Sequence, residues 1–272
     1  MYAAVDIGGT KTLVAVFNAD GTISEQSKFP TSPDYQTFLT DLANTVANLS
    51  TKSFVSGALG LRGNINRETG FSLFDDVLKW GQVAVRDDCS KILSCPLLME
   101  NDSKLAGLSE AILIKEEFRK VLYVTISTGI GSAFIVDGKL DQNTINSEVG
   151  KSLFEHDGKL QQWEDFASGR AIVATYHKPA SEIEDPASWH QIAQNIAVGL
   201  IDIVAAYTPE VVVFGGGVGA HFDKFEQPLA QIIQDIKPVE IVFPALRAAQ
   251  RPEEAVIYGC YELIRQSNNG HN

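Results

Sequence analysis

Apolar residues follow two rhythms along the chain, one typical of strands and one typical of helices. Short β-branched runs predict strands, and apolar residues at three- and four-residue spacing predict helices. In the first half, strands are expected over 2–5, 13–17, 23–29, 55–59 and 96–100, helices around 38–49 and 103–112, and an irregular stretch over 62–80. In the second half, strands are expected over 121–127, 131–136, 210–214 and 239–243, and helices over 164–176, 189–207, 222–236 and 253–266. This alternation predicts layered α/β structure.

One strand–turn–strand pattern occurs twice, over 5–17 and over 124–136. Each copy runs from an apolar stretch into Gly and Thr, then into a second apolar stretch that closes on Asp-Gly, which predicts a β-hairpin. Glycines let a ligand approach the backbone, and main-chain N–H groups with Thr hydroxyls suit phosphate oxygens. An ordinary glycine turn explains either copy alone. The pair, with Asp6 beside the first bend, favours two phosphate clamps.

A third glycine-rich element follows the apolar run 211–214, with four glycines within the next five residues. Glycines between the end of a strand and the start of a helix leave bare backbone against which a nucleotide's phosphate or ribose can lie. A tight packing turn explains the run equally well. The spacing is not that of a dinucleotide-binding GxGxxG motif.

Composition narrows the choice of partners and compartment. The 272 residues are 44% hydrophobic, enough for one large or two medium cores, and carry a net charge of −12. That charge disfavours nucleic acid and anionic membrane as partners, because phosphate backbones are held by excess Lys and Arg. The three cysteines, Cys89, Cys95 and Cys260, form no CxxC pair and predict neither disulfides nor a thiolate zinc cage. With no leader or membrane-spanning run, a cytoplasmic protein is expected.

Five motifs together resemble the ROK sugar kinases of the actin-like ATPase superfamily, over nearly the whole chain. They are Asp6-Ile-Gly-Gly-Thr-Lys11, Glu100-Asn-Asp102, Ser127-Thr-Gly-Ile-Gly131, Ser147-Glu-Val-Gly150 and Val213-Phe-Gly-Gly-Gly217. The stretch 126–144 also resembles the polyphosphate/ATP-glucokinase branch. The resemblance implies a two-domain actin-like (ribonuclease H-like) α/β fold with a central cleft. It places an N-terminal domain over 1–114, joined by a C-terminal helix at 251–266, and a second domain over 115–250. It also favours a homodimer.

The resemblance also implies roles for individual residues. Asp102 matches the catalytic base that accepts the proton of the sugar hydroxyl, although an aspartate there is also an ordinary helix N-cap. The matching sugar-binding residues are Asn64, Asn101, Glu148, Lys151 and Glu164. Those expected at the phosphates and nucleotide are Gly8, Gly9, Thr10, Lys11, Thr128, Gly129, Gly215, Gly216 and Gly217. Asp6 is expected to hold a hydrated Mg²⁺. Lys11 and Glu164 can equally be surface charges.

Two departures from the family pattern affect these expectations. Lys151 stands where many members have a histidine, and no cysteine follows it over 152–162, so no structural zinc is expected. His156 and Asp157 are interpreted as loop residues. Arg62 stands where a Pro-Gly is more usual. Because a lysine can only donate hydrogen bonds, Lys151 would offer a sugar a different contact from the histidine.

The function favoured by these residues is ATP-dependent phosphorylation of a hexose, with glucose at its 6-hydroxyl as the first choice. Polyphosphate remains an alternative phosphate donor. A long anionic chain would need a basic binding track, however, and the chain has only 22 Lys and Arg against 34 Asp and Glu. Fructose, mannose and N-acetylhexosamines remain alternative acceptors. A catalytically inactive sugar-sensing protein is the alternative from another class.

Overall fold

The computed structural model describes residues 1–75, 77–237, 240, 242–251 and 253–269. The chain forms two compact units, unit 1 from Met1–Ser109 with Glu253–Asn272 and unit 2 from Glu110–Pro252. The domain boundaries expected from the sequence follow residues 114 and 250. In the structure the first boundary falls inside a continuous helix, α3 (Asp102–Leu113), whose two ends belong to different units.

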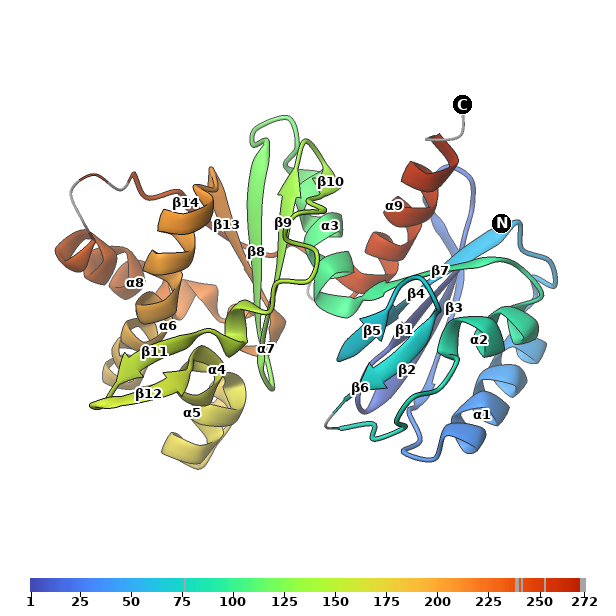
Figure 1. Ribbon diagram of the computed structural model, residues 1–272, viewed down its shortest axis with the longest axis horizontal. Coiled ribbons are helices and arrows are strands. Elements are labelled where there is room, and N and C mark those ends of the chain that lie inside the picture. The colour runs from blue at the N-terminus through green and yellow to red at the C-terminus, as the bar shows by residue number, and fades with distance from the viewer. Residues whose placement is uncertain (76, 238–239, 241, 252, 270–272) are drawn as a thin grey trace. The chain divides into compact units, whose positions relative to one another are not determined.

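Unit 1 is built on a five-stranded sheet in the order β3-β2-β1-β4-β7 (Figure 1). Its strands are β1 (Tyr2–Ile7), β2 (Lys11–Phe17), β3 (Ile23–Pro30), β4 (Ser56–Leu61) and β7 (Leu97–Asn101). The first three are antiparallel, whereas β1, β4 and β7 run parallel. In this register Ile7 pairs with Leu61, and Leu61 pairs with Asn101. The carboxyl ends of three strands therefore meet at one edge of the sheet.

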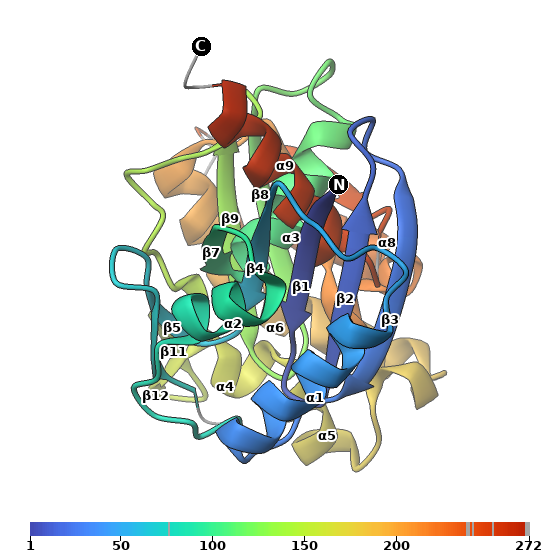
Figure 2. The same cartoon turned by 90° about the vertical axis from the view of Figure 1, so that its right-hand side faces the viewer.

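Helices cover both faces of this sheet because its strands alternate their side chains between two apolar cores. Ala3, Val5 and Ile7 face a core shared with α1 (Tyr35–Asn48) and α2 (Val85–Leu93), which lie over one face in Figure 2. The intervening residues of β1 and β2 face a second core, shared with α3 and α9 (Ala255–Asn269).

Glycine sets the distance between α3 and α9. A Cβ added at Gly259 in α9 would lie 2.1 Å from the carbonyl oxygen of Leu105 in α3. On the neighbouring strand, a Cβ at Gly60 would meet side chains of Val256 and Leu105 at 2.5 and 3.0 Å. Both helices therefore lie directly against the sheet edge, where α3 begins.

Part of the predicted irregular stretch is ordered, which corrects that expectation. β5 (Asn64–Asn66) and β6 (Phe71–Phe74) form a separate antiparallel pair. The helix α2 was not predicted either, because it spans only nine residues with three buried side chains, Val85, Cys89 and Leu93. Such short elements depend on partners that are distant in sequence.

Unit 2 repeats the arrangement of a hairpin followed by parallel strands, in the order β10-β9-β8-β13-β14. The strands are β8 (Lys120–Ile126), β9 (Ile130–Val136), β10 (Lys139–Leu140), β13 (Val211–Gly215) and β14 (Ala245–Ala248). The two duplicated patterns are thus both hairpins, as predicted. The strand predicted over 239–243 falls partly outside the described residues, and β14 lies just after it.

The core of unit 2 lies between this sheet and the helices that follow. Two long helices, α6 (Pro186–Tyr207) and α8 (Phe222–Ile236), supply much of it, together with the buried indoles of Trp163 and Trp189. The remaining elements are η1 (Val149–Lys151), β11 (Leu153–His156), β12 (Lys159–Gln162), α4 (Trp163–Ala167), α5 (Gly169–Tyr176), η2 (Ala180–Glu182) and α7 (Gly216–Gly219).

Two local expectations in unit 2 are wrong. The single helix predicted over 164–176 is two helices, because Ser168 has extended backbone and its hydroxyl caps α5 by accepting from the Ala171 amide. His156 lies on strand β11 rather than in a loop, and its ring stacks on Phe166 with centroids 4.1 Å apart. Asp157 lies in the turn that follows, at φ 52°.

Candidate functional site

The carboxyl edge of the unit 1 sheet brings together two carboxylates that are far apart in sequence. Asp6 lies near the end of β1, and Asp102 begins α3 directly after β7. Burial, with a further contribution from the nearby Asp102 carboxylate, raises the pKa of Asp6 to about 7. Lys11 acts in the opposite direction. Two neighbouring carboxylates at a glycine-rich bend form a site suited to a cation.

The bend between β1 and β2 is tight and close to bare backbone. The Gly8 amide donates to the Lys11 carbonyl at 3.1 Å, and a Cβ at Gly8 would lie 2.9 Å from that same oxygen. Thr10 and Lys11 are exposed beyond it. The predicted phosphate-binding residues of unit 1 therefore lie together at one bend, beside Asp6.

Asn101 holds the start of α3 in place. Its side-chain oxygen accepts from the Ser103 amide at 3.0 Å and from the Ser103 hydroxyl at 2.6 Å, as an N-cap does. Its amide nitrogen donates to the Gly63 carbonyl at 3.2 Å. The N-cap considered for Asp102 is thus supplied by Asn101, while an Asp102 oxygen accepts from the Ser103 amide at 2.7 Å.

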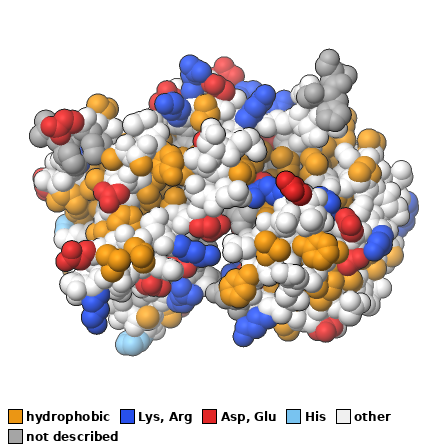
Figure 3. Space-filling view, in the orientation of Figure 1, with side chains coloured by type: hydrophobic (Ala, Val, Ile, Leu, Met, Phe, Trp, Pro, Cys, Tyr) orange, Lys and Arg blue, Asp and Glu red, His pale blue; other side chains and the backbone are white. Residues whose placement is uncertain are grey.

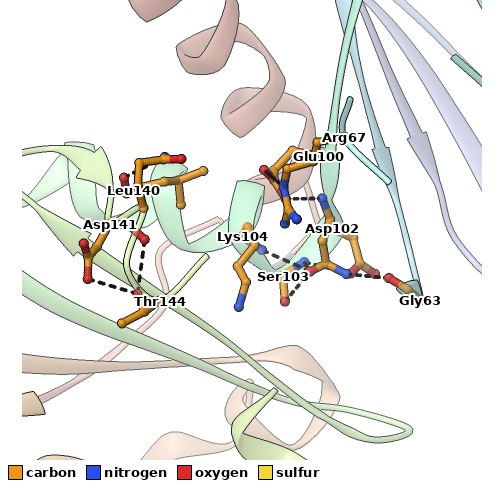
Figure 4. Close-up of polar contacts among 11 residues, drawn as sticks. Gly63, Arg67, Glu100, Asp102, Ser103, Lys104, Leu140, Asp141 and Thr144 are labelled. Carbon is orange, nitrogen blue, oxygen red and sulfur yellow. Dashed lines mark hydrogen bonds and ion pairs between the residues drawn. The ribbon is translucent and has the colours of Figure 1, made fainter. Parts of the chain in front are cut away.

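A buried ion pair lies next to these residues, as Figure 4 shows. The Arg67 guanidinium donates two hydrogen bonds to the Glu100 carboxylate, one from Nε at 2.7 Å and one from Nη2 at 2.5 Å. The same carboxylate accepts from the Asn101 amide at 2.6 Å. Such bidentate pairs fix geometry. No role is predicted for Arg67 or Glu100 from the sequence, although Glu100 adjoins Asn101 and Asp102 in one motif.

A second arginine reaches the glycine bend. Arg62 follows β4, and its Nε donates to Asp75 Oδ2 at 2.7 Å. Asp75 is buried, and its other oxygen accepts from the amides of Val77 and Leu78. A Cβ placed on Gly9 would lie 2.7 Å from Arg62 Nη1. The guanidinium therefore lies against the bend.

In unit 2 the corresponding bend carries a glutamate. Oε2 of Glu164 accepts from the Ile130 amide at 3.2 Å, and a Cβ on Gly129 would lie 2.6 Å from that oxygen. Thr128 beside it is exposed. The side chain of Glu164 is mostly buried, and Arg170 Nη2 lies 3.9 Å from Oε1. Glu164 therefore lies against the glycine bend, with its side chain 18% exposed.

The glycines after β13 lie close to the same hairpin. Gly216 has φ +79°, and a Cβ there would lie 2.6 Å from the Ile126 carbonyl oxygen. At Gly215 a Cβ would lie 2.1 Å from the hydroxyl of Tyr123, whereas Gly217 faces open space. Packing thus demands the first two glycines, and Gly217 leaves backbone accessible.

Three predicted sugar-binding residues lie on exposed segments. Asn64 is exposed on β5, and Glu148 and Lys151 are exposed around η1. The segment leading to Glu148 is held by a turn in which the Thr144 hydroxyl donates to an Asp141 carboxylate oxygen at 3.1 Å (Figure 4). A Cβ on Gly150 would lie 2.2 Å from the Ile130 carbonyl oxygen, which packs η1 against β9.

The described part of the chain contains neither a cluster of metal-binding side chains nor a membrane-spanning helix. No group of three or more His, Cys, Asp or Glu side chains there is arranged to hold a metal ion. No described helix has the length and apolar character needed to cross a bilayer. On the face drawn in Figure 3, basic side chains are interspersed with acidic ones.

Two α/β units of the same strand arrangement, each with a glycine bend beside a carboxylate, define the class as an actin-like fold. The ROK family model matches residues 2–267. The chain is similar to a glucokinase of Streptomyces coelicolor, 24% identical over 96% of both chains. An N-acetyl-D-glucosamine kinase of Haemophilus influenzae is 25% identical over 97% of this chain and 99% of its own.

Among solved structures, the ROK family glucokinase of Streptomyces griseus in complex with glucose and AMPPNP superposes with a TM-score of 0.80. It is 23% identical and covers 97% of this chain and 99% of its own. The chain therefore belongs to the ROK family, as one of its sugar kinases, and has the two-domain actin-like α/β fold predicted from its motifs.

Proposed function

We propose that the chain transfers the terminal phosphoryl group of ATP to a hexose, with glucose as acceptor at its 6-hydroxyl. The observation that carries this proposal is the pairing of Asp102, at the start of α3, with Asp6 beside the glycine bend. The glucokinase name of a relative that spans nearly the whole chain supports glucose. The N-acetyl-D-glucosamine kinase at similar identity keeps a second hexose as an alternative.

In the proposed reaction Asp102 is the base. The sugar oxygen forms a bond to the γ-phosphorus, the bond from that phosphorus to the bridging oxygen breaks to release ADP, and the hydroxyl proton passes to the Asp102 carboxylate. Asn101 and its Gly63 contact hold that carboxylate at the helix start. Glu148, Lys151, Glu164 and Asn64 are proposed to contact the sugar, along with Asn101.

The proposed phosphate and nucleotide contacts follow the glycines. Gly8, Gly9, Thr10 and Lys11 would contact the terminal phosphates. Thr128, Gly129 and the glycines at 215, 216 and 217 would lie along the rest of the nucleotide, and Gly217 has open space beside its backbone.

The residues around Asp6 fit a hydrated Mg²⁺. Two nearby carboxylates whose mutual repulsion and burial raise a pKa are stabilised by a divalent cation, and Mg²⁺ prefers carboxylate and water oxygens. Asp6 would hold the ion through its water, with Asp102 close by. When bound, Mg²⁺ would neutralise charge on the donor's terminal phosphates. The described residues form no competing cluster of metal-binding side chains.

A panel of acceptors and donors tests the proposal. Glucose, mannose, fructose and N-acetylglucosamine should be assayed for sugar phosphate formation with ATP and with polyphosphate. Glucose with ATP is expected to have the highest kcat/KM. Sugar binding without phosphorylation by either donor would indicate the sensor alternative, and faster turnover with polyphosphate would replace ATP as the donor.

A further inference from the structure

Arg62 is at the edge of the sheet where the proposed chemistry occurs. It comes directly after Leu61, which pairs with Ile7 of β1 on one side and with Asn101 of β7 on the other. Because these strands are parallel, Arg62 leaves the sheet between the glycine bend and the start of α3. No role is predicted for it from the sequence beyond its replacing a Pro-Gly.

The side chain of Arg62 is held and aimed. Its Nε donates to Asp75, whose own carboxylate is buried and fixed by the amides of Val77 and Leu78. The side chain of Arg62 is 23% exposed. Its Nη1 lies beside Gly9, 2.7 Å from the position a Cβ on that residue would take. A guanidinium anchored by one nitrogen in this way keeps its charge at a defined position.

Negative charge is concentrated around the glycine bend, so a cationic side chain there would offset it. Asp6 and Asp102 place two carboxylates beside a position proposed for a phosphoryl group that itself carries negative charge. Charge that develops on the phosphoryl oxygens in the transition state is stabilised by fixed cations, and an arginine in this role is worth about 10³–10⁵ in rate. Lys11 is exposed, whereas Arg62 is partly buried and anchored.

We propose that Arg62 contacts the phosphoryl group during its transfer and stabilises its charge in the transition state. This inference rests on the proposed kinase function. Arg62 takes no proton and forms no bond in the step: the sugar oxygen still bonds to the γ-phosphorus, ADP leaves, and the proton goes to Asp102. The competing explanation is a purely structural tie between the end of β4 and the segment that contains Asp75.

The test compares Arg62→Ala and Arg62→Lys with a matched arginine variant. Arg119→Ala removes an exposed arginine that pairs with Asp137 in unit 2, and it should leave kcat unchanged. Arg62→Ala should lower kcat by about 100- to 1,000-fold with the sugar KM within about threefold of wild type. Arg62→Lys should retain part of the rate, since it keeps the charge without the fork.

Chemical rescue separates a direct role from a structural one. Guanidinium ion added at millimolar concentration should restore part of the kcat of Arg62→Ala and none of that of Asp102→Asn. Asp75→Ala leaves Arg62 in the chain and removes only its hydrogen bond to Asp75, so it should lose less kcat than Arg62→Ala. Melting temperatures should be measured for each variant.

Four outcomes would overturn the inference. A kcat for Arg62→Ala within about threefold of wild type would remove Arg62 from the reaction. A raised sugar KM at unchanged kcat would make it a sugar contact instead. Equal losses of melting temperature and kcat in Arg62→Ala and Asp75→Ala, without rescue, would make it a structural tie. A wild-type chain that phosphorylates no sugar would overturn the proposed function, and the inference with it.

Discussion

Asp102 begins helix α3, and its carboxylate is near enough to Asp6 to raise the pKa of that group. Asp102→Asn should lower kcat by about 100- to 10,000-fold, the usual worth of a lost general base, while sugar binding stays nearly intact. The amide oxygen can still accept from the Ser103 amide, so the fold should be kept. Steady-state kinetics and sugar titration measure the two effects. Asp137→Asn is the matched control, and near-normal turnover in Asp102→Asn would contradict the proposal.

Asp6 should make the protein less stable as the pH rises. Its pKa is 3.8 in the unfolded chain and about 7 in the folded one, so between these values the folded state holds a proton that the unfolded state has lost. Stability from this group therefore declines from about pH 4 to about pH 7. Asp6→Asn should remove the decline and raise the free energy of unfolding at pH 8, by at most about 4 kcal/mol.

Urea unfolding from pH 2 to 8, with chelator present, measures the effect of Asp6 and of the control below. Asp34→Asn is a control of opposite sign, because hydrogen bonds from Thr37 lower the pKa of Asp34. Its stabilisation is present at neutral pH and is lost as the pH falls through that lowered pKa. If the free energy of unfolding depended on pH in the same way in wild type and Asp6→Asn, the predicted destabilisation by the Asp6 carboxylate would be wrong.

Lys151 bears on which hexose is accepted. It is exposed at the end of η1 and offers only donors, whereas the histidine common in the family can also accept. Lys151→His should change the ranking of glucose, mannose, fructose and N-acetylated hexosamines by kcat/KM, with each hydrogen bond lost or gained worth about 1 kcal/mol. Lys52→His is an exposed control elsewhere. An unchanged ranking would place Lys151 outside the sugar site.

At the scale of elements, glycines decide how closely segments approach. Gly259→Ala would place a methyl group 2.1 Å from the Leu105 carbonyl, so α9 must move away from α3. Such overpacking should cost about 1–3 kcal/mol in the free energy of unfolding. Gly217→Ala meets open space, so it should leave stability nearly unchanged but raise the KM for ATP. Denaturant unfolding and kinetics on both variants distinguish packing from ligand contact, and equal stability in the two would refute the packing argument.

The elements themselves were predictable to different degrees. The two glycine hairpins and the long helices α6 and α8 carry strong local signals, namely turn residues and sustained apolar spacing. The pairs β5–β6 and β11–β12 have strands of only three or four residues, and they form because partners across the turn satisfy their backbone. Local pattern alone does not reveal such pairs.

At the scale of the whole molecule, the predicted two-domain actin-like α/β fold and ROK membership are confirmed. The metal requirement is testable on the intact protein. The purified chain should contain no stoichiometric zinc, and a strong chelator should abolish activity that Mg²⁺, and not Zn²⁺, restores. Elemental analysis that finds one tightly held zinc per chain would contradict this expectation.

The sequence by itself determined the fold class, the two glycine bends and the list of candidate residues, because each depends on short local patterns. Only the tertiary structure decided which of them meet. The register that aligns β1, β4 and β7 brings Asp6 to Asp102 and Arg62 to Gly9, across 96 and 53 positions of chain. It also assigned the N-cap of α3 to Asn101. Electrostatic and packing effects act through space, so residue spacing could not reveal the raised pKa of Asp6 or the anchored guanidinium of Arg62.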